Sequence, residues 1–156
     1  MTAISPRTLK NIATLDARAQ AAFTQFAQLA AGEAAKHGCE YHMIAGNRSW
    51  AEQDALYARF RTAPGSRVTN ARGGYSNHNF GIAGDFGVFK GKVYLDESDP
   101  RLAERVHRAC AAHALDCGLD WGGHWESFQD APHYEMHTVL SLKQKRARFE
   151  QKGSVL

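Results

Sequence analysis

Hydrophobic residues recur at intervals of three and four along the first part of the chain, as expected for helices that bury one face. Ser5 and Pro6 are typical of a helix start, as N-cap and first helical residue, and the apolar positions that follow are Leu9, Ile12 and Leu15. A longer helix is predicted over residues 16–37, and Gly38 is placed to end it in a left-handed cap. Its apolar stripe consists of Ala22, Phe23, Phe26, Leu29, Ala30 and Ala34.

Other segments alternate between the two sides with the period of two that a strand requires. Residues 39–45 form the first predicted strand, with Tyr41, Met43 and Ala45 on one face. A second strand surrounds Asp85, and Lys90-Gly91-Lys92 then predicts a hairpin turn into a return strand over 93–95. Residues 133–137 form the last predicted strand, which turns its odd-numbered side chains to one face.

Two further helices and one long loop complete the predicted pattern. Ser49 caps a helix over 50–61, whose expected inward residues are Ala55, Leu56 and Phe60. An Asp-Pro pair opens the next helix, over 101–116. Residues 62–79 between them hold several glycines and few apolar groups, so we expect a loop there that borders a functional cleft.

The size and composition are those of an ordinary globular domain. The chain has 156 residues, of which 44% are hydrophobic and 22% charged, so we expect one domain over residues 1–156. The first residues lack the basic region and apolar run of a secretory signal, and no stretch of about 18 apolar residues could span a membrane. The sequence therefore predicts synthesis in a cytoplasm without membrane insertion.

The net charge of +3 is mildly basic, and much of the excess lies in residues 143–152. A solvated helix face is the favoured interpretation of this segment. The alternative is attraction to a polyanion such as nucleic acid or a bacterial cell wall. Charge alone does not decide between these two interpretations. We expect no nucleic-acid partner.

The three cysteines, Cys39, Cys110 and Cys117, cannot all pair with one another within one chain. Cys110 and Cys117 would lie about 10 Å apart along a helix, beyond the roughly 7 Å between Cα atoms that a disulfide allows. Free buried thiols are therefore predicted. The C-x-x-H runs that begin at Cys39 and Cys110 lack the second ligand pair that a zinc site on cysteines would need.

A loop that carries one histidine leads directly into a short strand that carries one carboxylate. These residues, His78 and Asp85, offer an imidazole nitrogen and a carboxylate oxygen, which hold Zn²⁺ in catalytic sites where a fourth position is left for water. His133 is the predicted third ligand because it begins an extended segment, and His124 is its main rival. Asp130, three residues before His133, could act as general base.

The sequence S-N-H-N-F-G-I-A-G-D at residues 76–85 matches the pattern S-x-H-x-x-G-x-A-x-D at every specified position. The matching residues are Ser76, His78, Gly81, Ala83 and Asp85. This pattern resembles the signature of the D-alanyl-D-alanine metallopeptidase family, which includes VanY-type carboxypeptidases and phage L-alanyl-D-glutamate endopeptidases.

Two further motifs carry the same resemblance in the family's order. Asp130 and His133 resemble the acidic residue and zinc-binding histidine of the second signature, which follows a Trp-rich run like that at 121–125. Arg48, within Gly46-Asn47-Arg48-Ser49, resembles the arginine of a G-x-R-S element. The resemblance spans residues 5–137.

The resemblance implies an α+β fold, in which a small antiparallel sheet carries a zinc site and is flanked by helices, as in hedgehog-like and D-alanyl-D-alanine peptidase-like domains. The implied zinc ligands are His78, Asp85 and His133. Asp130 would take a proton from water and return it to the leaving amine, and Arg48 would stabilise the oxyanion. Ser76 and Gln53 are the implied substrate contacts, with Gln53 the looser match.

The implied substrate is the peptidoglycan stem peptide. The motifs look most like the phage endolysin branch, which cleaves between L-alanine and D-glutamate; a D-alanyl-D-alanine carboxypeptidase or dipeptidase is the alternative. A non-catalytic zinc-containing binding module, as in hedgehog domains, is a third possibility.

We expect a monomeric catalytic domain without a separate wall-binding domain, made in the host cytoplasm and acting on the wall after release. Weak wall affinity from the basic residues Lys145, Arg146 and Arg148 is a further hypothesis.

Overall fold

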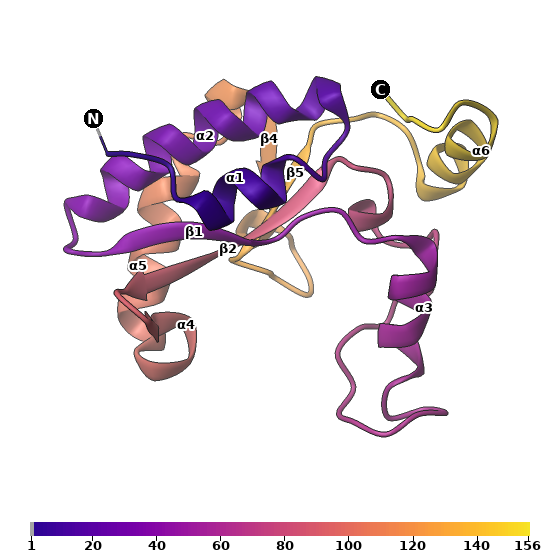
Figure 1. Cartoon of the computed structure of the whole chain (residues 1–156), viewed down its shortest axis with the longest axis horizontal. Helices are drawn as coiled ribbons and strands as arrows, with labels where there is room; N and C mark the ends of the chain where they lie inside the picture. Colours follow the sequence, from indigo (N-terminus) through magenta and orange to yellow (C-terminus); the bar gives the residue numbers. More distant parts are fainter. Residues whose placement is uncertain (1) are drawn as a thin grey trace.

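A computed structural model describes residues 2–156 as an α+β fold, with one antiparallel sheet flanked by helices (Figure 1). The strands are β1 (Glu40–Ala45), β2 (Ala83–Lys90), β3 (Val93–Tyr94), β4 (Leu119–Trp121) and β5 (His133–Met136). The helices are α1 (Pro6–Ile12), α2 (Ala17–Ala35), α3 (Trp50–Ala58), α4 (Leu95–Ser98), α5 (Pro100–Ala111) and α6 (Leu142–Lys152). The strands follow the order β1-β2-β5-β4, and β3 pairs with β2, which confirms the predicted fold class.

The first two helices begin and end at the residues that favour such ends. Ser5 caps α1 by accepting a hydrogen bond from the Thr8 backbone N–H, and Asp16 caps α2 in the same way through Arg18 N–H. Gly38 follows α2 in the left-handed conformation, at φ +67°, where a side chain would be strained. The predicted boundaries of both helices are therefore confirmed to within a few residues.

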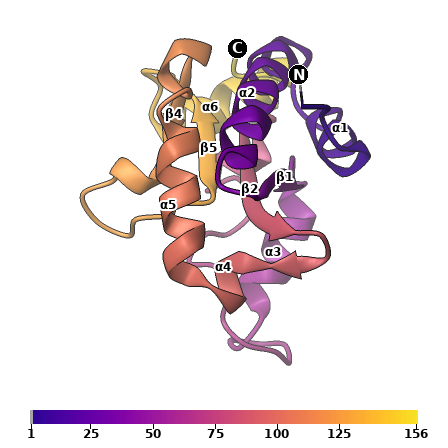
Figure 2. The same ribbon diagram turned by 90° about the vertical axis from the view of Figure 1, so that its left-hand side faces the viewer.

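The main core lies between the sheet and the helices α2 and α5, which run next to each other over one sheet face (Figure 2). Phe26 of α2 meets Phe86 of β2 edge-on at a ring separation of 5.3 Å, and it meets Tyr134 of β5 at 4.4 Å. Val106 and Cys110 of α5 are completely buried beside them. Because side chains alternate along a strand, the residues next to Phe86 and Tyr134 face the other side of the sheet.

Helix α3 differs from its prediction in length and in its buried face. It ends at Ala58, and the expected inward residue Phe60 is 66% exposed in a left-handed conformation at φ 70°. Ala55 is also exposed, while Gln53 is fully buried. The reason is that α3 lies at the far end of the molecule from the main core, so its buried side chain meets a polar loop (Figure 1).

A smaller apolar cluster joins the C-terminal segment to the rest of the fold. Phe80, Ile82 and Val155 are buried together, and Phe149 of α6 stacks on Trp50 with ring centroids 6.0 Å apart. The segment 141–152 is thus an ordered helix with an apolar side.

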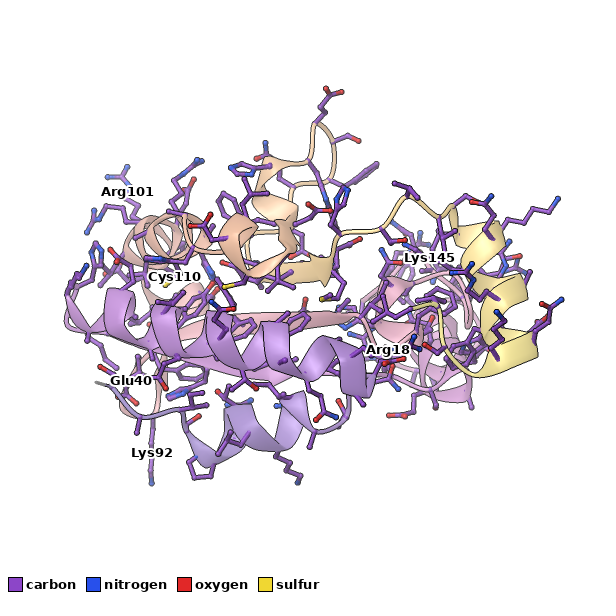
Figure 3. The ribbon with its side chains drawn as sticks, turned by 90° about the horizontal axis from the view of Figure 1, so that it is seen from above. Arg18, Glu40, Lys92, Arg101, Cys110 and Lys145 are labelled. Carbon is purple, nitrogen blue, oxygen red and sulfur yellow. The ribbon has the colours of Figure 1, made fainter. Side chains whose placement is uncertain are left out.

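Most charged residues of α6 are exposed, as the interpretation of a solvated face predicted, and Lys145 is the exception. Lys145 points towards the body of the protein (Figure 3) and is only 4% exposed. Its ammonium group donates to the Asn77 side chain instead of facing water. Lys145 is therefore not available to a polyanion, because the packing of α6 against the loop before β2 covers it.

The three cysteines are free and buried, as predicted, and burial raises the pKa of each thiol. Across residues 2–156, no helix is both long and apolar enough to cross a membrane.

Candidate metal centre

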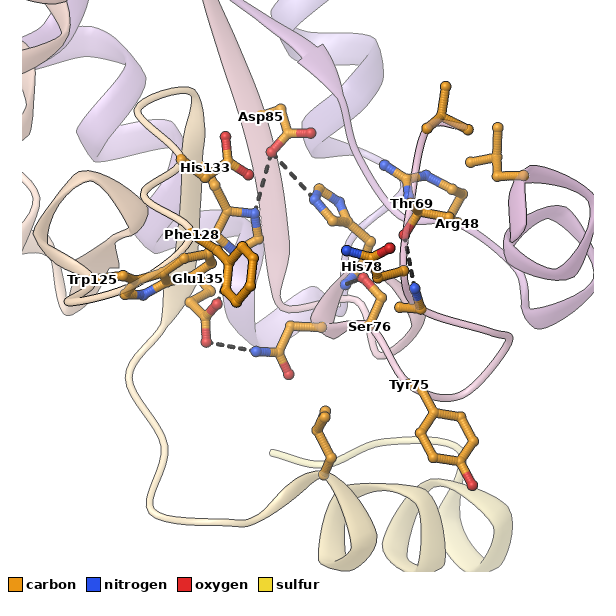
Figure 4. A pocket seen from close by; sticks show the side chains of 17 residues that line it. Arg48, Thr69, Tyr75, Ser76, His78, Asp85, Trp125, Phe128, His133 and Glu135 are labelled. Carbon is orange, nitrogen blue, oxygen red and sulfur yellow. Dashed lines mark hydrogen bonds and ion pairs between the residues drawn. The ribbon is translucent and has the colours of Figure 1, made fainter. Parts of the chain in front are cut away.

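The fold brings His78, Asp85 and His133 together at one end of the pocket shown in Figure 4. One oxygen of Asp85, Oδ1, lies 3.2 Å from Nε2 of His78 and 3.2 Å from Nδ1 of His133. The ligand atoms of the three residues all lie within 4.8 Å of one another. Among the described residues 2–156, this is the one group of three or more such side chains close enough to share a metal ion.

Strand pairing places two of these residues side by side. Asp85 of β2 is directly opposite His133 of β5 in the antiparallel register, so their side chains project from the same face at the spacing of a cross-strand pair. On the other side of β2, the pairing with β1 is irregular between Met43 and Ala45, next to Asp85. An irregularity of this kind redirects side chains and is frequent beside functional sites.

His78 comes from a single 3-10 turn, Asn77–Asn79, which precedes β2. Ser76 caps this turn by accepting from the His78 backbone N–H at 3.3 Å. The His78 carbonyl accepts from the backbone N–H of Arg48 at 2.7 Å. This contact joins the loop that carries the first predicted ligand to the loop that carries the predicted arginine.

Gly81 has a physical reason to be a glycine. Its φ of +70° lies in the left-handed region, and a Cβ added to it would be only 2.7 Å from the backbone nitrogen of Asp16. Its own N–H donates to Asn47 Oδ1 at 2.9 Å, and its carbonyl accepts from Asp16 N–H at 2.9 Å. These contacts fix the chain at Gly81, two residues before β2 begins and four residues before Asp85.

The donor set fits a tetrahedral zinc-type ion. Two imidazoles and one carboxylate are a common catalytic set, and ligands about 2.0–2.1 Å from such an ion would be about 3.3 Å apart, close to the separations around Asp85. The remaining nitrogen of each histidine already has an acceptor. His78 Nδ1 donates to the Gly46 carbonyl at 3.1 Å, and His133 Nε2 donates to Glu135 Oε1 at 2.7 Å. Such partners orient ligating histidines in metal sites.

The charges of the cluster favour an ionised carboxylate. Burial opposes ionisation of Asp85, but hydrogen bonds from His133 and His78 outweigh burial and lower the pKa of Asp85 strongly. Burial also opposes protonation of His133, yet its hydrogen bonds to Asp85 and Glu135 raise its pKa to about 9. Asp85 is therefore charged at neutral pH, as a metal ligand must be.

Asp130 lines the same pocket as the three predicted ligands. The sequence alone left its direction open, because a regular strand would turn residues 130 and 133 to opposite faces. In the structure β5 begins only at His133, and a turn precedes it in which His133 N–H donates to the Asp130 carbonyl at 3.1 Å. Burial raises the pKa of Asp130, and the negative charge of Asp85 raises it further.

Arg48 also lines the pocket, whereas Gln53 does not lie where we expected it. Gln53 is fully buried, so it cannot contact a substrate directly. Its Oε1 accepts from Arg48 Nη1 at 2.8 Å, and its Nε2 donates to the Ala71 carbonyl at 2.9 Å. Gln53 thus holds the arginine in place from behind, because α3 turns this side chain into the fold. Ser76 lies at the pocket, where its hydroxyl also caps the turn that carries His78.

The pocket is open, has a volume of about 790 Å³, and is partly walled by aromatic side chains. Trp125, Phe128 and Glu135 lie on the His133 side in Figure 4, and Arg48, Thr69 and Ser76 lie on the other side.

The predicted Trp-rich run thus divides into two parts. Trp121 is buried in the main core, while the ring of Trp125 lies 5.0 Å from that of His133 in the pocket wall. His124, the rival third ligand, packs its ring on Trp121 and lies outside the metal cluster.

Glu135 and Asn77 lie at the site but were not among the predicted site residues. Glu135 follows His133 by two positions on β5 and therefore shares its face, a signal that was visible in the alternation of this strand. Asn77 precedes His78 and donates to Glu135 Oε2 at 2.6 Å. No pattern in the sequence indicated that contact, because it joins two separate segments through their side chains.

Comparison with known proteins shows which family this fold and site resemble. Residues 69–136 match the family model described as D-alanyl-D-alanine carboxypeptidase. This match agrees with the resemblance to the D-alanyl-D-alanine metallopeptidase family that was inferred from the motifs.

A particular relative is the peptidoglycan L-alanyl-D-glutamate endopeptidase CwlK of Bacillus subtilis (strain 168). It is 41% identical over 107 residues, which cover 66% of this chain and 64% of CwlK. The matching region therefore spans slightly less than two thirds of that relative's length.

Solved structures share the fold at low sequence identity. The L-Ala D-Glu endopeptidase ChiX of Serratia marcescens is 17% identical, with a TM-score of 0.53 over 86% of this chain and 89% of ChiX. A variant of the vancomycin resistance D,D-pentapeptidase VanY, solved in complex with Zn(II), is 14% identical, with a TM-score of 0.50 over 90% of this chain and 80% of that one. These likenesses support the fold and leave the substrate to be argued from the site.

Proposed function

We propose that this protein is a zinc-dependent peptidoglycan hydrolase that cleaves the L-alanyl-D-glutamate amide bond of the stem peptide. The observation that carries the proposal is the convergence of His78, Asp85 and His133 in a pocket that Asp130 and Arg48 also line. The similarity to CwlK supports the choice of bond. We further propose that the enzyme acts as a monomer on the cell wall, after release from the cytoplasm in which it is made.

The proposed ligands of Zn²⁺ are His78, Asp85 and His133. When bound, the ion supplies Lewis acidity, which polarises the scissile carbonyl and makes water more acidic. Asp130 receives the proton of the attacking water and passes it to the leaving amine. Its raised pKa suits this task, because a carboxylate that is too weak a base would not hold the proton between the two transfers.

Arg48 stabilises the negative charge that develops on the carbonyl oxygen. Its guanidinium is an obligate cation, and the hydrogen bond to the buried Gln53 reduces the number of orientations it can take. A donor that is already oriented needs no reorganisation during the reaction, which is the main source of oxyanion stabilisation.

The pocket suits an extended peptide better than a compact small molecule. Its volume of about 790 Å³ is open to solvent, and the apolar Trp125 and Phe128 face polar Thr69 and Ser76 across it. The apolar groups of a stem peptide can pack on the aromatic side, and its backbone can form hydrogen bonds with the polar side.

The alternative is hydrolysis of a terminal D-alanyl-D-alanine bond. The matching family model carries this description, so both activities should be compared in the same assay. The two activities release different products from one substrate, so a single digestion distinguishes them.

The test is digestion of purified peptidoglycan by the zinc-loaded protein, with and without a zinc chelator, followed by mass spectrometry of the fragments. We expect new D-glutamate N-termini that disappear with chelator and return when Zn²⁺ is restored. Release of terminal D-alanine would assign the carboxypeptidase activity instead. Folded, zinc-loaded protein that releases neither product would refute the hydrolase.

Asp130→Asn provides the matched control for the chemistry. We expect it to bind Zn²⁺ with unchanged stoichiometry and to lose about 10²–10⁴-fold in turnover, the usual contribution of a general base. If Asp130→Asn retained full turnover, the proposed proton transfer would be wrong even if the cleavage itself were confirmed.

A further inference from the structure

A continuous line of hydrogen bonds leads from the C-terminal helix to the metal centre. Lys145 Nζ donates to Asn77 Oδ1 at 2.8 Å, and Asn77 Nδ2 donates to Glu135 Oε2 at 2.6 Å. Glu135 Oε1 then accepts from His133 Nε2 at 2.7 Å. Figure 4 shows Glu135 beside His133 at the edge of the pocket, and Lys145 approaches from α6 (Figure 3).

The first residue of this line, Lys145, is buried and is hydrogen-bonded to a residue that is distant in sequence. Lys145 is 4% exposed, whereas lysine is almost never fully buried without a partner, because removing the ammonium group from water is costly. Lys145 is also distant in sequence from the residues it meets. The contact with Asn77 spans 68 positions, so it exists only because α6 packs against the loop before β2.

We propose that Lys145, Asn77 and Glu135 act together as positioning residues that hold His133 in the orientation needed to bind the metal. This inference rests on the metal site of the proposed function and adds the C-terminal helix to it. None of the three residues is a metal ligand in this proposal; they act through His133.

Glu135 determines which nitrogen of His133 is available to a metal. A carboxylate oxygen can only accept, so the contact with Glu135 places the imidazole hydrogen on Nε2. Nδ1 lies 3.2 Å from Asp85 Oδ1, so it is the nitrogen that would give up its proton to a bound metal while Nε2 keeps the hydrogen donated to Glu135. A histidine binds a metal through the lone pair of its unprotonated nitrogen, so Glu135 presents the correct nitrogen to the ion.

Lys145 determines the direction of the Asn77 side-chain amide. An amide side chain can turn over, exchanging its donor and acceptor ends. Lys145 can only donate hydrogen bonds, so Asn77 must turn its acceptor Oδ1 towards α6 to bond with it. That orientation sends the NH₂ group to Glu135; the opposite one would set an oxygen against a carboxylate.

This line of hydrogen bonds connects the segments that carry two of the predicted ligands. Asn77 directly precedes His78 in the 3-10 turn, while Glu135 lies two residues after His133 on β5. Lys145 therefore stabilises the relative placement of the loop and strand that carry the two histidines. Partners of this kind typically change metal affinity by about 10–100-fold when they are removed.

The sign of the effect separates this proposal from ordinary electrostatics. Loss of a positive charge near the site should, by Coulomb's law alone, make it bind a cation more tightly. The proposed positioning role requires the opposite: Lys145→Met should bind Zn²⁺ more weakly. Methionine retains an unbranched apolar stem, so the packing of α6 is disturbed as little as possible.

The test measures the Zn²⁺ affinity of the metal-free full chain by competition with a chromophoric chelator. We expect a rise in Kd of about tenfold or more for Lys145→Met and for Asn77→Ala. Lys143→Met, which removes the same charge from an exposed position of α6, should leave the Kd within about twofold of the unmodified protein.

The Co²⁺-substituted protein adds a readout of geometry. The visible absorption of Co²⁺ reports the ligand arrangement directly, so we expect altered bands for Lys145→Met and unaltered bands for Lys143→Met. Circular dichroism establishes that each variant is folded. If Lys145→Met does not fold, Asn77→Ala carries the test alone, since its side chain lies in a partly exposed turn.

Unchanged or tighter Zn²⁺ binding by folded Lys145→Met and Asn77→Ala would overturn the inference. An unmodified protein that binds no Zn²⁺ would instead overturn the proposed function on which the inference rests. The two failures are therefore distinguishable in one set of titrations.

Discussion

Substitution of Gly81 by alanine tests whether the crowding at the start of β2, rather than backbone conformation alone, requires glycine there. Gly81 combines a φ of +70° with close crowding, since the methyl carbon of an alanine would lie 2.7 Å from the Asp16 backbone nitrogen. The neighbour cannot move freely, because Asp16 N–H donates to the Gly81 carbonyl and Asp16 also begins α2. The expected loss of stability therefore has two parts.

The first part is conformational and the second is steric. A left-handed conformation costs a residue other than glycine about 1–2 kcal/mol. An additional methyl group forced against a fixed neighbour typically costs about 1–3 kcal/mol. We therefore expect Gly81→Ala to lower the free energy of unfolding by about 2–5 kcal/mol.

Gly118 offers a matched control, because it has the same conformation without the crowding. Its φ is +77°, and a Cβ added there would meet nothing within 4 Å. Gly118→Ala should therefore show only the conformational part, about 1–2 kcal/mol. The difference between the two variants isolates the steric contribution at Gly81.

The assay is urea unfolding of both variants and the unmodified protein, followed by circular dichroism in the presence of a chelator so that metal binding does not contribute. With an m-value of about 1–3 kcal/mol per molar urea, a steric contribution of about 2 kcal/mol separates the two midpoints by roughly 1 M. Equal losses for the two variants would show that the close approach to Asp16 does not matter, and the reasoning about the motif glycine would fail.

Two further predictions concern the pocket and the ends of the chain. Arg48→Lys should lower kcat by about 10²-fold and leave the Zn²⁺ affinity unchanged. The reason is that lysine lacks the planar guanidinium fork that Gln53 orients. An unchanged kcat in a peptide-cleavage assay would remove Arg48 from the mechanism. Burial opposes ionisation of Asp16, but hydrogen bonds from the Ser154 hydroxyl and from Arg18 outweigh burial and lower the pKa of Asp16 below 3.8. The charged carboxylate therefore stabilises the folded state above pH 3.8. This stabilisation is lost as the pH falls through the lowered pKa. Asp16→Asn should accordingly be less stable by up to about 1 kcal/mol at pH 7, and the difference in urea midpoint should shrink below pH 3.8; a difference that is independent of pH would contradict the role of the charge.

Local features of the structure could be predicted from the sequence because their causes lie within a few residues. Ser5 and Ser49 cap helices through hydrogen bonds to backbone groups three residues away. Gly38 has a positive φ where helix α2 ends, and Gly91 has one in the hairpin turn between β2 and β3. The clustering of His78, Asp85 and His133 was inferred from motif spacing and family resemblance, and the pairing of β2 with β5 supplies its geometric cause.

The sequence by itself thus determined which residues could cap, turn, alternate and ligate, since these properties depend on side-chain chemistry and short spacings. Only the tertiary structure decided that Gln53 is buried behind Arg48 and that Phe60 is exposed, because α3 packs at the end of the molecule instead of on the main core. Lys145 is the plainest case. Its position in a basic helix indicated a solvated charge, yet the docking of α6 buries it against Asn77, and no local pattern encodes a contact between residues 68 positions apart.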